Sequence, residues 1–506
     1  MMFKHIPLLS MLIWLPILGA IPVAMLNNSK KATQTRVLAL IIALISLILC
    51  IPLYLSFNTA SAEMQFKEHL TWILALKINY DLGVDGISMP LVILTCFTTL
   101  LVVLTSWTMV KKKIGQYLSA FLVMQGAVIG VFSSLDTMLF YFFWEAMLIP
   151  MYLSIGIWGM EHRSYAAIKF FLYTFFGSAL LLVVLLYLRM HSGSFYILDY
   201  YRLHMSMAIQ ILVFLGFFIA FAIKVPMWPF HTWLPDSHTE APVGGSVVLS
   251  ALMLKLGGYG FLRFSLPIVP DASCHLDWLM IGLSLIAIVY IGFIAIAQTD
   301  MKKLIAYSSI AHMGFVTLGA FMLFIIVVRT GSHQDAYLSL EGAMVQMISH
   351  AFSAGAMFLA FELLYKQIHS RHINDFGGIA KTMPYFSAFF MVFAMSNVGL
   401  PGTSSFVGEF MILLSAFKAS FWVTFLAAST LVIGAVYTLW MYKRVFYGPI
   451  TNSSVAQLTD IVLTDKVIFI LITAAIIWIG IYPNALLNVL HTSISQLLQE
   501  ALQSKL

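Results

Sequence analysis

Charged side chains are scarce in this chain. Asp, Glu, Lys and Arg together make up 9% of its 506 residues, whereas a soluble protein carries roughly 25%. This scarcity excludes a globular enzyme that folds in water. Hydrophobic residues make up 61% of the chain, and they fall in runs of about 20 residues, the length at which a helix crosses a bilayer core of roughly 30 Å. The sequence therefore predicts an all-α polytopic membrane protein.

Cysteine pairs and nucleotide-binding motifs are also missing. The three cysteines, Cys50, Cys96 and Cys274, lie far apart with no C-x-x-C spacing, which argues against an iron–sulfur or zinc site built by this chain. No G-x-x-x-x-G-K-[ST] loop is present, and no G-x-G-x-x-G follows a strand. We therefore expect no metal and no cofactor in this chain. The net charge of +6 does not gather into a basic face, so nucleic acid is not an expected partner.

The apolar runs predict about 14 transmembrane helices. They lie near 7–26, 35–56, 86–109, 115–133, 136–157, 165–188, 208–236, 242–264, 276–297, 303–328, 341–365, 383–416, 420–446 and 466–488. The first run is long enough to span and lacks an A-x-A-like exit, so we do not expect a cleaved signal peptide. Residues 57–85 form the longest external loop, and 489–504 have the apolar spacing of an interfacial amphipathic helix.

The basic residues predict the orientation. Of the 27 Lys and Arg residues, 15 fall in loops after odd-numbered helices and 9 on the opposite side. The positive-inside rule then places the odd loops in the cytoplasm, or the matrix, and both termini outside. The other three, Lys169, Lys224 and Lys255, fall within spans. Lys169 lies about one turn inside its helix, where a lysine can pair or snorkel to the surface.

Four charged residues are expected at mid-membrane depth: Glu145, Lys224, Lys255 and Glu409. A charge there costs about 2.5 to 3.5 kcal/mol on insertion scales, so it usually has a partner and a function. An ammonium group removed from water can release its proton and regain it beside a carboxylate. We interpret the four residues as proton carriers. The alternative is that they form buried ion pairs that only hold helices together.

The histidines form two groups. His312 and His350 lie within spans, where a neutral imidazole can relay protons; a buried histidine bonded to a carbonyl is an equal alternative. The second group lies with two carboxylates in the connection HTWLPDSHTEAP, which we expect to be a cytoplasmic loop. Its spacing resembles a metal site only loosely, and a polar proton entrance or a structural turn is favoured. Its members are His231, Asp236, His238 and Glu240.

Two of the predicted helices contain breaking residues beside a charge. Pro226, Pro229 and Pro235 follow Lys224, and a G-L-P-G sequence at 399–402 precedes Glu409. Proline removes a backbone donor and clashes with the preceding turn, and broken spans occur where protein or water satisfies the freed groups. We predict broken helices 7 and 12 within two inverted five-helix repeats, helices 4–8 and 9–13.

This pattern divides the chain into four parts. Residues 1–114 hold helices 1 to 3 and the outer loop, 115–264 the first repeat, 276–446 the second repeat, and 447–506 the last transmembrane helix and the amphipathic tail.

Three segments carry a resemblance to a known family. They are YFFWEAMLIPMYLSIGIWG, AIKVPMWPFHTWLPDSHTEAPVGGSVVLSALMLKLGGYGFLRF and DMKKLIAYSSIAHMGF. From about residue 85 to 450 the chain resembles the antiporter-like membrane subunits of respiratory complex I, the NADH:quinone oxidoreductase, and among them the bacterial M-type chains and their mitochondrial counterpart, the fourth membrane-encoded chain. Multisubunit cation/proton antiporters are the alternative family, and they share the Glu and Lys positions.

The resemblance implies a proton-pumping module without a redox centre. It implies that Glu145 pairs with Lys224, that Lys255 links two half-channels and that Glu409 leads towards the outer face. It places His312 and His350 on a central polar axis. Flavin, iron–sulfur clusters and quinone are then expected in partner subunits, and the partners are other membrane-arm subunits and lipid. The expected location is the bacterial inner membrane, with periplasmic termini.

Overall fold

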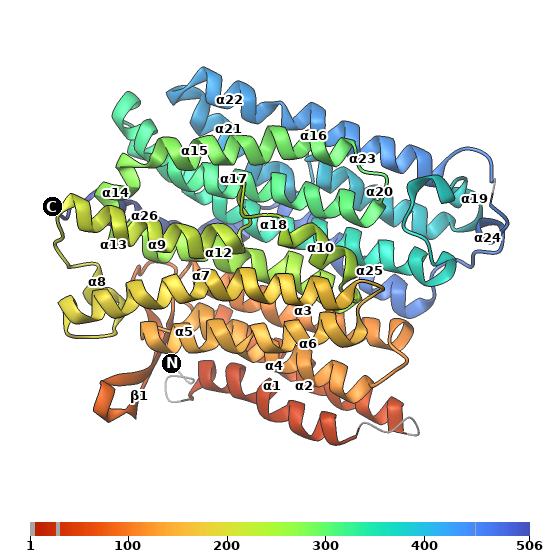
Figure 1. The fold of residues 1–506 in the computed structure, drawn as a ribbon, viewed down its shortest axis with the longest axis horizontal. Helices are drawn as coiled ribbons and strands as arrows, with labels where there is room; N and C mark the ends of the chain where they lie inside the picture. Colours follow the sequence, from red (N-terminus) through yellow and green to blue (C-terminus); the bar gives the residue numbers. More distant parts are fainter. Residues whose placement is uncertain (1–5, 27–30, 451) are drawn as a thin grey trace. The chain divides into compact units, whose positions relative to one another are not determined.

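A computed structural model describes residues 6–26, 31–450 and 452–506 of the chain. Among these residues, 13 helical segments are long and apolar enough to cross a membrane, and Figure 1 shows a fold made almost entirely of helices. The predicted all-α polytopic fold is confirmed. The helix expected at 383–416 consists of two shorter helices, α20 (Pro384–Val398) and α21 (Ser404–Ala419), so it is absent from the 13.

The chain divides into two compact units. The first unit contains residues 1–225, 255–276 and 488–506, and the second contains 226–254 and 277–487. The predicted division into four parts with inverted repeats stays a prediction.

The first unit is built from helices and one hairpin. Its elements are α1 (Leu8–Met25), α2 (Ala32–Leu55), β1 (Gln65–Ile73), η2 (Leu74–Leu76), β2 (Ile78–Val84), α3 (Ser88–Met109), α4 (Ile114–Ser133), α5 (Thr137–Ala146), α6 (Leu148–Trp158), α7 (Arg163–Ser192), α8 (Ile197–Tyr200), α9 (Met207–Lys224), η4 (Phe261–Ser265), α13 (Leu266–Ile268) and α14 (Pro270–His275). Two further helices, α12 (Leu254–Gly260) and α26 (Asn484–Leu502), lie mostly in this unit. Helix α4 packs against α1, α3 and α5, and α7 packs against α9.

The segment expected to be an external loop, 57–85, contains a β-hairpin. Strands β1 and β2 pair antiparallel with Leu70 opposite Tyr80. The turn between them contains Lys77 in the left-handed region, at φ 54°, a conformation usually given to Gly or Asn, so the sequence lacks the usual hairpin signal. Glu68 on β1 accepts a hydrogen bond from the Leu9 backbone N–H at 2.8 Å, which ties the hairpin to the first turn of α1.

The tail helix α26 packs on protein. The predicted amphipathic helix is present, but it begins at Asn484 and buries Leu490, Ile494 and Leu498 within the structure. Ser493 Oγ accepts a hydrogen bond from the Gly86 backbone N–H at 2.8 Å. The apolar face therefore lies against protein within the structure, and the predicted interfacial position stays a prediction.

The second unit is centred on three long helices. Its elements are α10 (Trp233–Glu240), α11 (Val243–Val248), η3 (Leu249–Met253), α15 (Asp277–Leu285), η5 (Ile286–Tyr290), α16 (Ile291–Ile296), α17 (Met301–Thr330), α18 (His333–Ile368), η6 (Ile373–Asp375), α19 (Ile379–Thr382), α20, α21, α22 (Phe421–Ala428), α23 (Thr430–Phe446), α24 (Ser453–Ala456) and α25 (Leu463–Ile481). Helices α17, α18 and α21 pack on one another, and α10 packs on α17. The eleventh predicted helix is longer than expected because Ser332 caps α18 by accepting a hydrogen bond from Asp335 N–H.

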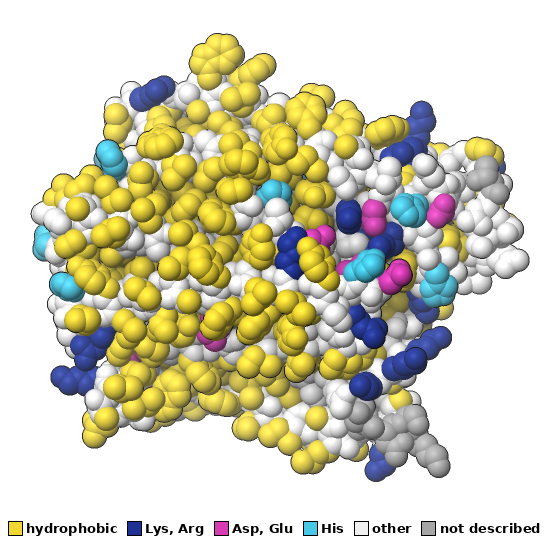
Figure 2. All heavy atoms as spheres, viewed as in Figure 1, with side chains coloured by type: hydrophobic (Ala, Val, Ile, Leu, Met, Phe, Trp, Pro, Cys, Tyr) yellow, Lys and Arg dark blue, Asp and Glu magenta, His cyan; other side chains and the backbone are white. Residues whose placement is uncertain are grey.

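The surface has the distribution of a membrane protein. Figure 2 shows hydrophobic side chains over most of the face that it draws, and in the second unit charged and His side chains gather near α19 and α24. Large exposed apolar residues such as Phe176, Phe421 and Trp422 are typical of a surface that lipid or another protein covers.

Asp136 joins the hairpin to the helix that carries Glu145. It caps α5 by accepting hydrogen bonds from the N–H groups of Met138 and Leu139, at 2.8 and 3.0 Å, and it accepts a third from Asn79 N–H of β2 at 2.9 Å. Burial raises the pKa of this carboxyl to about 6. One buried side chain therefore satisfies three backbone donors.

We expect Asp136→Ala to destabilise the protein by about 1 to 3 kcal/mol, because buried backbone donors lose their acceptor. Asp136→Asn keeps an amide oxygen that can cap α5 and should cost much less. Thermal unfolding of the purified membrane protein measures the difference. Equal losses in the two variants would contradict the capping role.

Candidate functional site

Glu145 and Lys224 come together in the first unit. Lys224 is 1% exposed, and it interacts electrostatically with Glu145. Its Nζ lies 4.9 Å from the centre of the Trp144 ring, a distance at which the ring face attracts a cation. The lysine Nζ and Glu145 Oε1 have no hydrogen-bond partner among the described residues. The ammonium group is thus held by an aromatic face and a nearby carboxylate, and it is free to exchange partners.

The local sequence explains this position. Helix α5 ends at Ala146, one residue after Glu145, and Pro150 in the first turn of α6 cannot donate to the Ala146 carbonyl. Helix α9 ends at Lys224, directly before Val225 and Pro226. Both charged residues therefore lie at helix ends, where unpaired backbone groups add polarity.

The helix that carries Lys255 packs against the end of α9. Lys255 is fully buried in α12, which follows a π-helical turn. Gly257 brings this helix against the end of α9, since a Cβ at that position would lie 2.7 Å from Val225 N and 2.8 Å from Phe221 O. A larger residue would force the two helices apart.

The second unit holds a separate polar cluster. Glu409 on α21 is 2% exposed, and its Oε1 lies 2.7 Å from His312 Nδ1 on α17 and accepts a hydrogen bond from Gln346 Nε2 on α18 at 2.8 Å. The His350 ring lies 5.9 Å from the His312 ring, centre to centre. The three predicted residues His312, His350 and Glu409 are therefore neighbours, and the carboxylate gives His312 a partner that can share a proton.

Gly408 permits this cluster. A Cβ at that position would lie 2.6 Å from the Gln346 backbone nitrogen and 2.8 Å from its Cα. Helix α21 can therefore approach α18 closely enough for Glu409 to reach the Gln346 amide.

Most of HTWLPDSHTEAP forms a helix. Asp236, His238 and Glu240 belong to α10, and His231 lies in the turn before it. The expected loop is therefore wrong, because the proline at 235 lies in the first turn, where a helix tolerates it; its cytoplasmic position stays a prediction. The His238 ring stacks on Phe358 at 4.4 Å. Arg371 forms two ion pairs, from Nη1 to Glu240 Oε1 at 3.1 Å and from Nε to Asp300 Oδ2 at 3.2 Å.

Two basic residues counted in loops are buried within helices. Lys302 is 0% exposed in the first turn of α17, where it forms an ion pair with Glu362 and donates to the Ala241 carbonyl at 2.8 Å. Arg263 lies in the helical span 243–268 and is 8% exposed. Both residues lie near the ends of apolar runs. The count of basic residues in the sequence analysis therefore placed them in loops.

Sequence reasoning missed Trp144, Gln346, Lys302 and Glu362. Trp144 directly precedes Glu145 in the sequence. An aromatic ring next to a carboxylate within a span could have been predicted to bind the same cation as that carboxylate, here Lys224. Gln346 precedes His350 by four residues, one helical turn. The Lys302–Glu362 pair joins residues 60 apart and leaves no sequence pattern.

Lys169 Nζ lies 5.5 Å from the centre of the Tyr165 ring. Among the described residues, no group of three His, Cys, Asp or Glu side chains is placed to hold a metal ion.

Two family models match the chain. Residues 134–434 match the model described as NADH:quinone oxidoreductase/Mrp antiporter, TM, and residues 11–131 match NADH-ubiquinone oxidoreductase chain 4, amino terminus. The chain belongs to the NADH:quinone oxidoreductase/Mrp antiporter family. The first of these models alone covers more than half of the chain, and the family resemblance extends beyond the predicted 85–450.

Relatives in this family match over nearly their whole length. NADH-quinone oxidoreductase subunit M of Rhodobacter capsulatus is 42% identical over 97% of this chain and 96% of that protein. NADH-ubiquinone oxidoreductase chain 4 of Marchantia polymorpha is 40% identical over 97% of both chains.

Solved structures of two membrane complexes contain chains with a similar fold. A chain of respiratory complex I from Thermus thermophilus matches with a TM-score of 0.87 and 27% identity, over 97% of this chain and 99% of that one. A chain of the Mrp complex from Dietzia sp. matches with a TM-score of 0.80 and 19% identity, over 96% of this chain and 52% of that one; this match shows a shared fold.

We expect Gly408→Ala to destabilise the protein by about 1 to 3 kcal/mol, because the added methyl group overpacks the contact with the Gln346 backbone. Gly282→Ala on α15 is the matched control, since nothing lies within 4 Å of a Cβ there. Thermal unfolding of the purified protein compares the two. A Gly408→Ala protein as stable as the control would show that the contact is not tight.

Proposed function

We propose that this chain is a proton-translocating membrane-arm subunit of NADH:quinone oxidoreductase, complex I. Protons move along its buried Glu, Lys and His side chains, and electron transfer from NADH to quinone in other subunits drives them. The observation that carries the proposal is the loosely held Lys224, with its ammonium nitrogen over the Trp144 ring and near Glu145. A lysine that only held helices together would be locked in a tight ion pair.

The energetics allow Lys224 to act as a switch. Two unit charges a few ångströms apart interact by about 4 kcal/mol at an effective dielectric constant of 20, and about 1.4 kcal/mol changes a proton affinity tenfold. Moving Glu145 and Lys224 together or apart by a few ångströms can therefore decide whether the lysine keeps its proton. The coupling of electron transfer to this distance is the task of neighbouring subunits.

The remaining carriers extend the route. We propose that protons enter from the cytoplasm near the end of α9, load Lys224, pass to Lys255 and then, through His312, His350 and Glu409, reach the outer side. In the second unit the 2.7 Å contact between His312 and Glu409 supports this order. Two inverted repeats with broken helices 7 and 12 would place the two clusters in equivalent positions.

The partners and location follow from the family. The chain is a multi-pass membrane protein of a respiratory complex, and its partners are other complex I subunits. We propose neighbouring antiporter-like chains and lipid as its direct contacts, flavin and iron–sulfur clusters in other subunits, and the bacterial inner membrane, with periplasmic termini, as its location.

A free-standing cation/proton antiporter is the second candidate. The fold shared with the Mrp complex supports it, whereas the relatives that are 40–42% identical over their full length support complex I. Affinity purification from the native membrane distinguishes the two. Complex I predicts co-purifying flavin, iron–sulfur clusters and NADH oxidation, and an antiporter predicts none of them.

We expect Glu145→Ala and Lys224→Ala to abolish NADH:quinone turnover while hydride transfer from NADH to an artificial acceptor continues, because pumping and quinone reduction are coupled. Both activities are measured in membranes. The matched controls are Glu161→Ala and Lys111→Ala, whose side chains are exposed, and these should keep both activities. Full quinone-linked turnover in the Glu145→Ala complex would refute the assignment.

We expect Trp144→Leu to lower quinone-linked turnover severalfold, since the lysine loses about 0.5 to 2 kcal/mol of cation–π attraction. Trp144→Phe keeps an aromatic face but loses the hydrogen bond from Nε1 to Ser178 Oγ, 3.1 Å long. It should therefore retain more activity than Trp144→Leu. If the two variants lose the same amount of activity, the ring face does not hold the lysine.

A further inference from the structure

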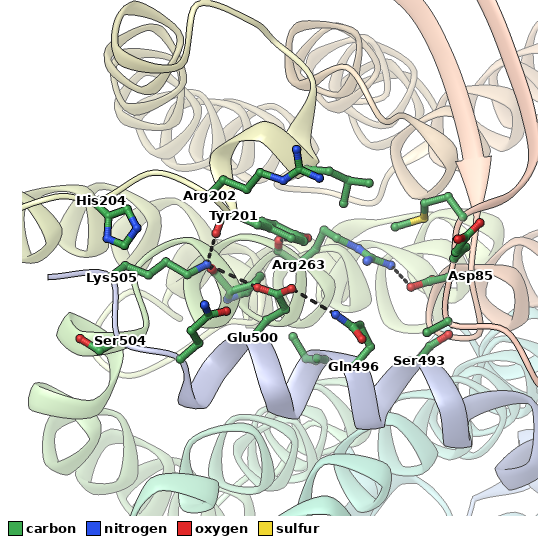
Figure 3. Close-up of a pocket in the computed structure, with 17 residues that line it drawn as sticks. Asp85, Tyr201, Arg202, His204, Arg263, Ser493, Gln496, Glu500, Ser504 and Lys505 are labelled. Carbon is green, nitrogen blue, oxygen red and sulfur yellow. Dashed lines mark hydrogen bonds and ion pairs between the residues drawn. The ribbon is translucent and has the colours of Figure 1, made fainter.

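A polar cavity of about 600 Å³ lies within the first unit, on the side of the C-terminus. Helix α26 forms one wall, and the other walls come from the segment after α8, the end of the span 243–268 and the turn between β2 and α3. Figure 3 shows the side chains that line it. Arg202, His204 and Gln496 are exposed at its rim, so water from the adjoining surface can enter it, and its many polar groups can hold that water.

A buried ion pair lines this cavity. Arg263 Nη2 lies 2.6 Å from Asp85 Oδ2, with side chains that are 9% and 4% exposed. Asp85 is itself fixed, because it accepts hydrogen bonds from the N–H groups of Ile87 and Ser88 at 3.1 and 3.0 Å. The Arg263 carbonyl accepts a hydrogen bond from the Tyr201 hydroxyl at 2.9 Å. The guanidinium is therefore held in one place at the wall of the cavity.

Arg263 lies two helical turns from a proposed proton carrier. Lys255, Tyr259 and Arg263 follow one another at intervals of four residues, so successive members are neighbours on the helix surface. At a rise of about 1.5 Å per residue, roughly 12 Å separate Lys255 from Arg263 along the helix. Tyr259 lies between them, and its ring centre is 5.6 Å from the Arg263 guanidinium carbon. Lys255 is fully buried, and Arg263 is the member of this row that lines the cavity.

We propose that Arg263 seals the first unit against protons from the cavity. A guanidinium does not release its proton under physiological conditions, so it cannot pass protons on. A fixed positive charge buried at the cavity wall also repels hydronium ions and other cations, as charged constrictions in channels do. Asp85 keeps the charge in place and offsets its desolvation. The seal prevents protons already pumped from returning to Lys255.

The surrounding charges fit this role. The nearest acidic group is Asp85, which is paired with the guanidinium itself. Lys505 Nζ is 3.5 Å from Glu500 Oε2 and also donates to the carbonyls of Tyr201 and Pro267. The carboxylate of Glu500 is therefore engaged with a second fixed cation. The third acidic residue that lines the cavity, Glu63, is exposed to water.

A purely structural clamp is the competing explanation, because the same pair joins the start of α3 to the end of the span 243–268. A clamp needs only a bond, whereas a seal needs a permanent positive charge. The two explanations therefore differ in proton leak when the charge is removed from a complex that still assembles.

The test uses the whole complex reconstituted in lipid vesicles. Passive proton influx driven by a potassium diffusion potential is followed with a pH-sensitive dye, with no NADH present, and NADH:quinone turnover is measured separately. We expect Arg263→Gln to raise the passive leak severalfold while turnover changes less than twofold. Arg263→Lys should leak less than Arg263→Gln. Arg202→Gln, at the exposed rim of the same cavity, is the matched control and should be as tight as the parent.

A switchable charge makes the test independent of folding differences between variants. Histidine has an unperturbed pKa of about 6.5, so Arg263→His should be tight at pH 5.5 and leaky at pH 8 within one assembled complex, relative to the parent at each pH. An Arg263→Gln complex as tight as the parent, or a leak in Arg263→His that does not change with pH, would overturn the seal. If Arg263→Gln fails to assemble, the Arg263→His comparison decides.

The seal depends on the proposed function, since it protects a proton carrier, but the two fail differently. Loss of the proposed function appears as normal quinone turnover in Glu145→Ala. Loss of the seal appears as an unchanged passive leak in the Arg263 variants, a measurement that needs no pumping.

Discussion

The structure depends on the cost of placing charge where water is scarce. A chain with 9% charged residues uses nearly every buried charge in a contact with another polar or aromatic group. Lys302 has Glu362, Arg263 has Asp85, and Glu409 has His312 and Gln346. Lys224 differs from these residues. Its ammonium group lies over the Trp144 ring and interacts with Glu145 without a hydrogen bond to it. The strength of each contact separates a structural charge from one that can change its proton.

Close helix packing makes these contacts possible. Gly257 lets α12 approach the end of α9, and Gly408 lets α21 approach α18. In both places a methyl group would occupy the space that a backbone atom of the next helix now fills. The glycines carry no chemistry, but they bring the titratable side chains within range of their partners. The positions of the charges and of the small residues are thus parts of the same arrangement.

The proposed mechanism gives two cations of the first unit opposite roles. Near α9 a lysine is loosely held, which favours exchange. At the cavity beside α26 an arginine is tightly held, which favours exclusion. The tail helix α26 and the turn after β2 form walls of the cavity that Arg263 lines. The hydrogen bond from the Gly86 N–H to Ser493 Oγ joins these two walls. The difference between lysine and arginine as acids underlies the contrast.

The sequence alone determined the membrane class and, among the described residues, the number of spans to within one, because apolar runs are local features of the chain. Isolated charges within those runs are local too, so it also singled out Glu145, Lys224, Lys255, His312, His350 and Glu409 as candidates, whose role stays a prediction. It did not determine the hairpin, whose turn contains Lys77 in the left-handed region, or the helix α10, which contains Pro235. Only the tertiary structure decided which charges pair. Partners such as Asp85 and Arg263 lie 178 residues apart in the chain, and nothing in either segment specifies the other until helix packing brings them together.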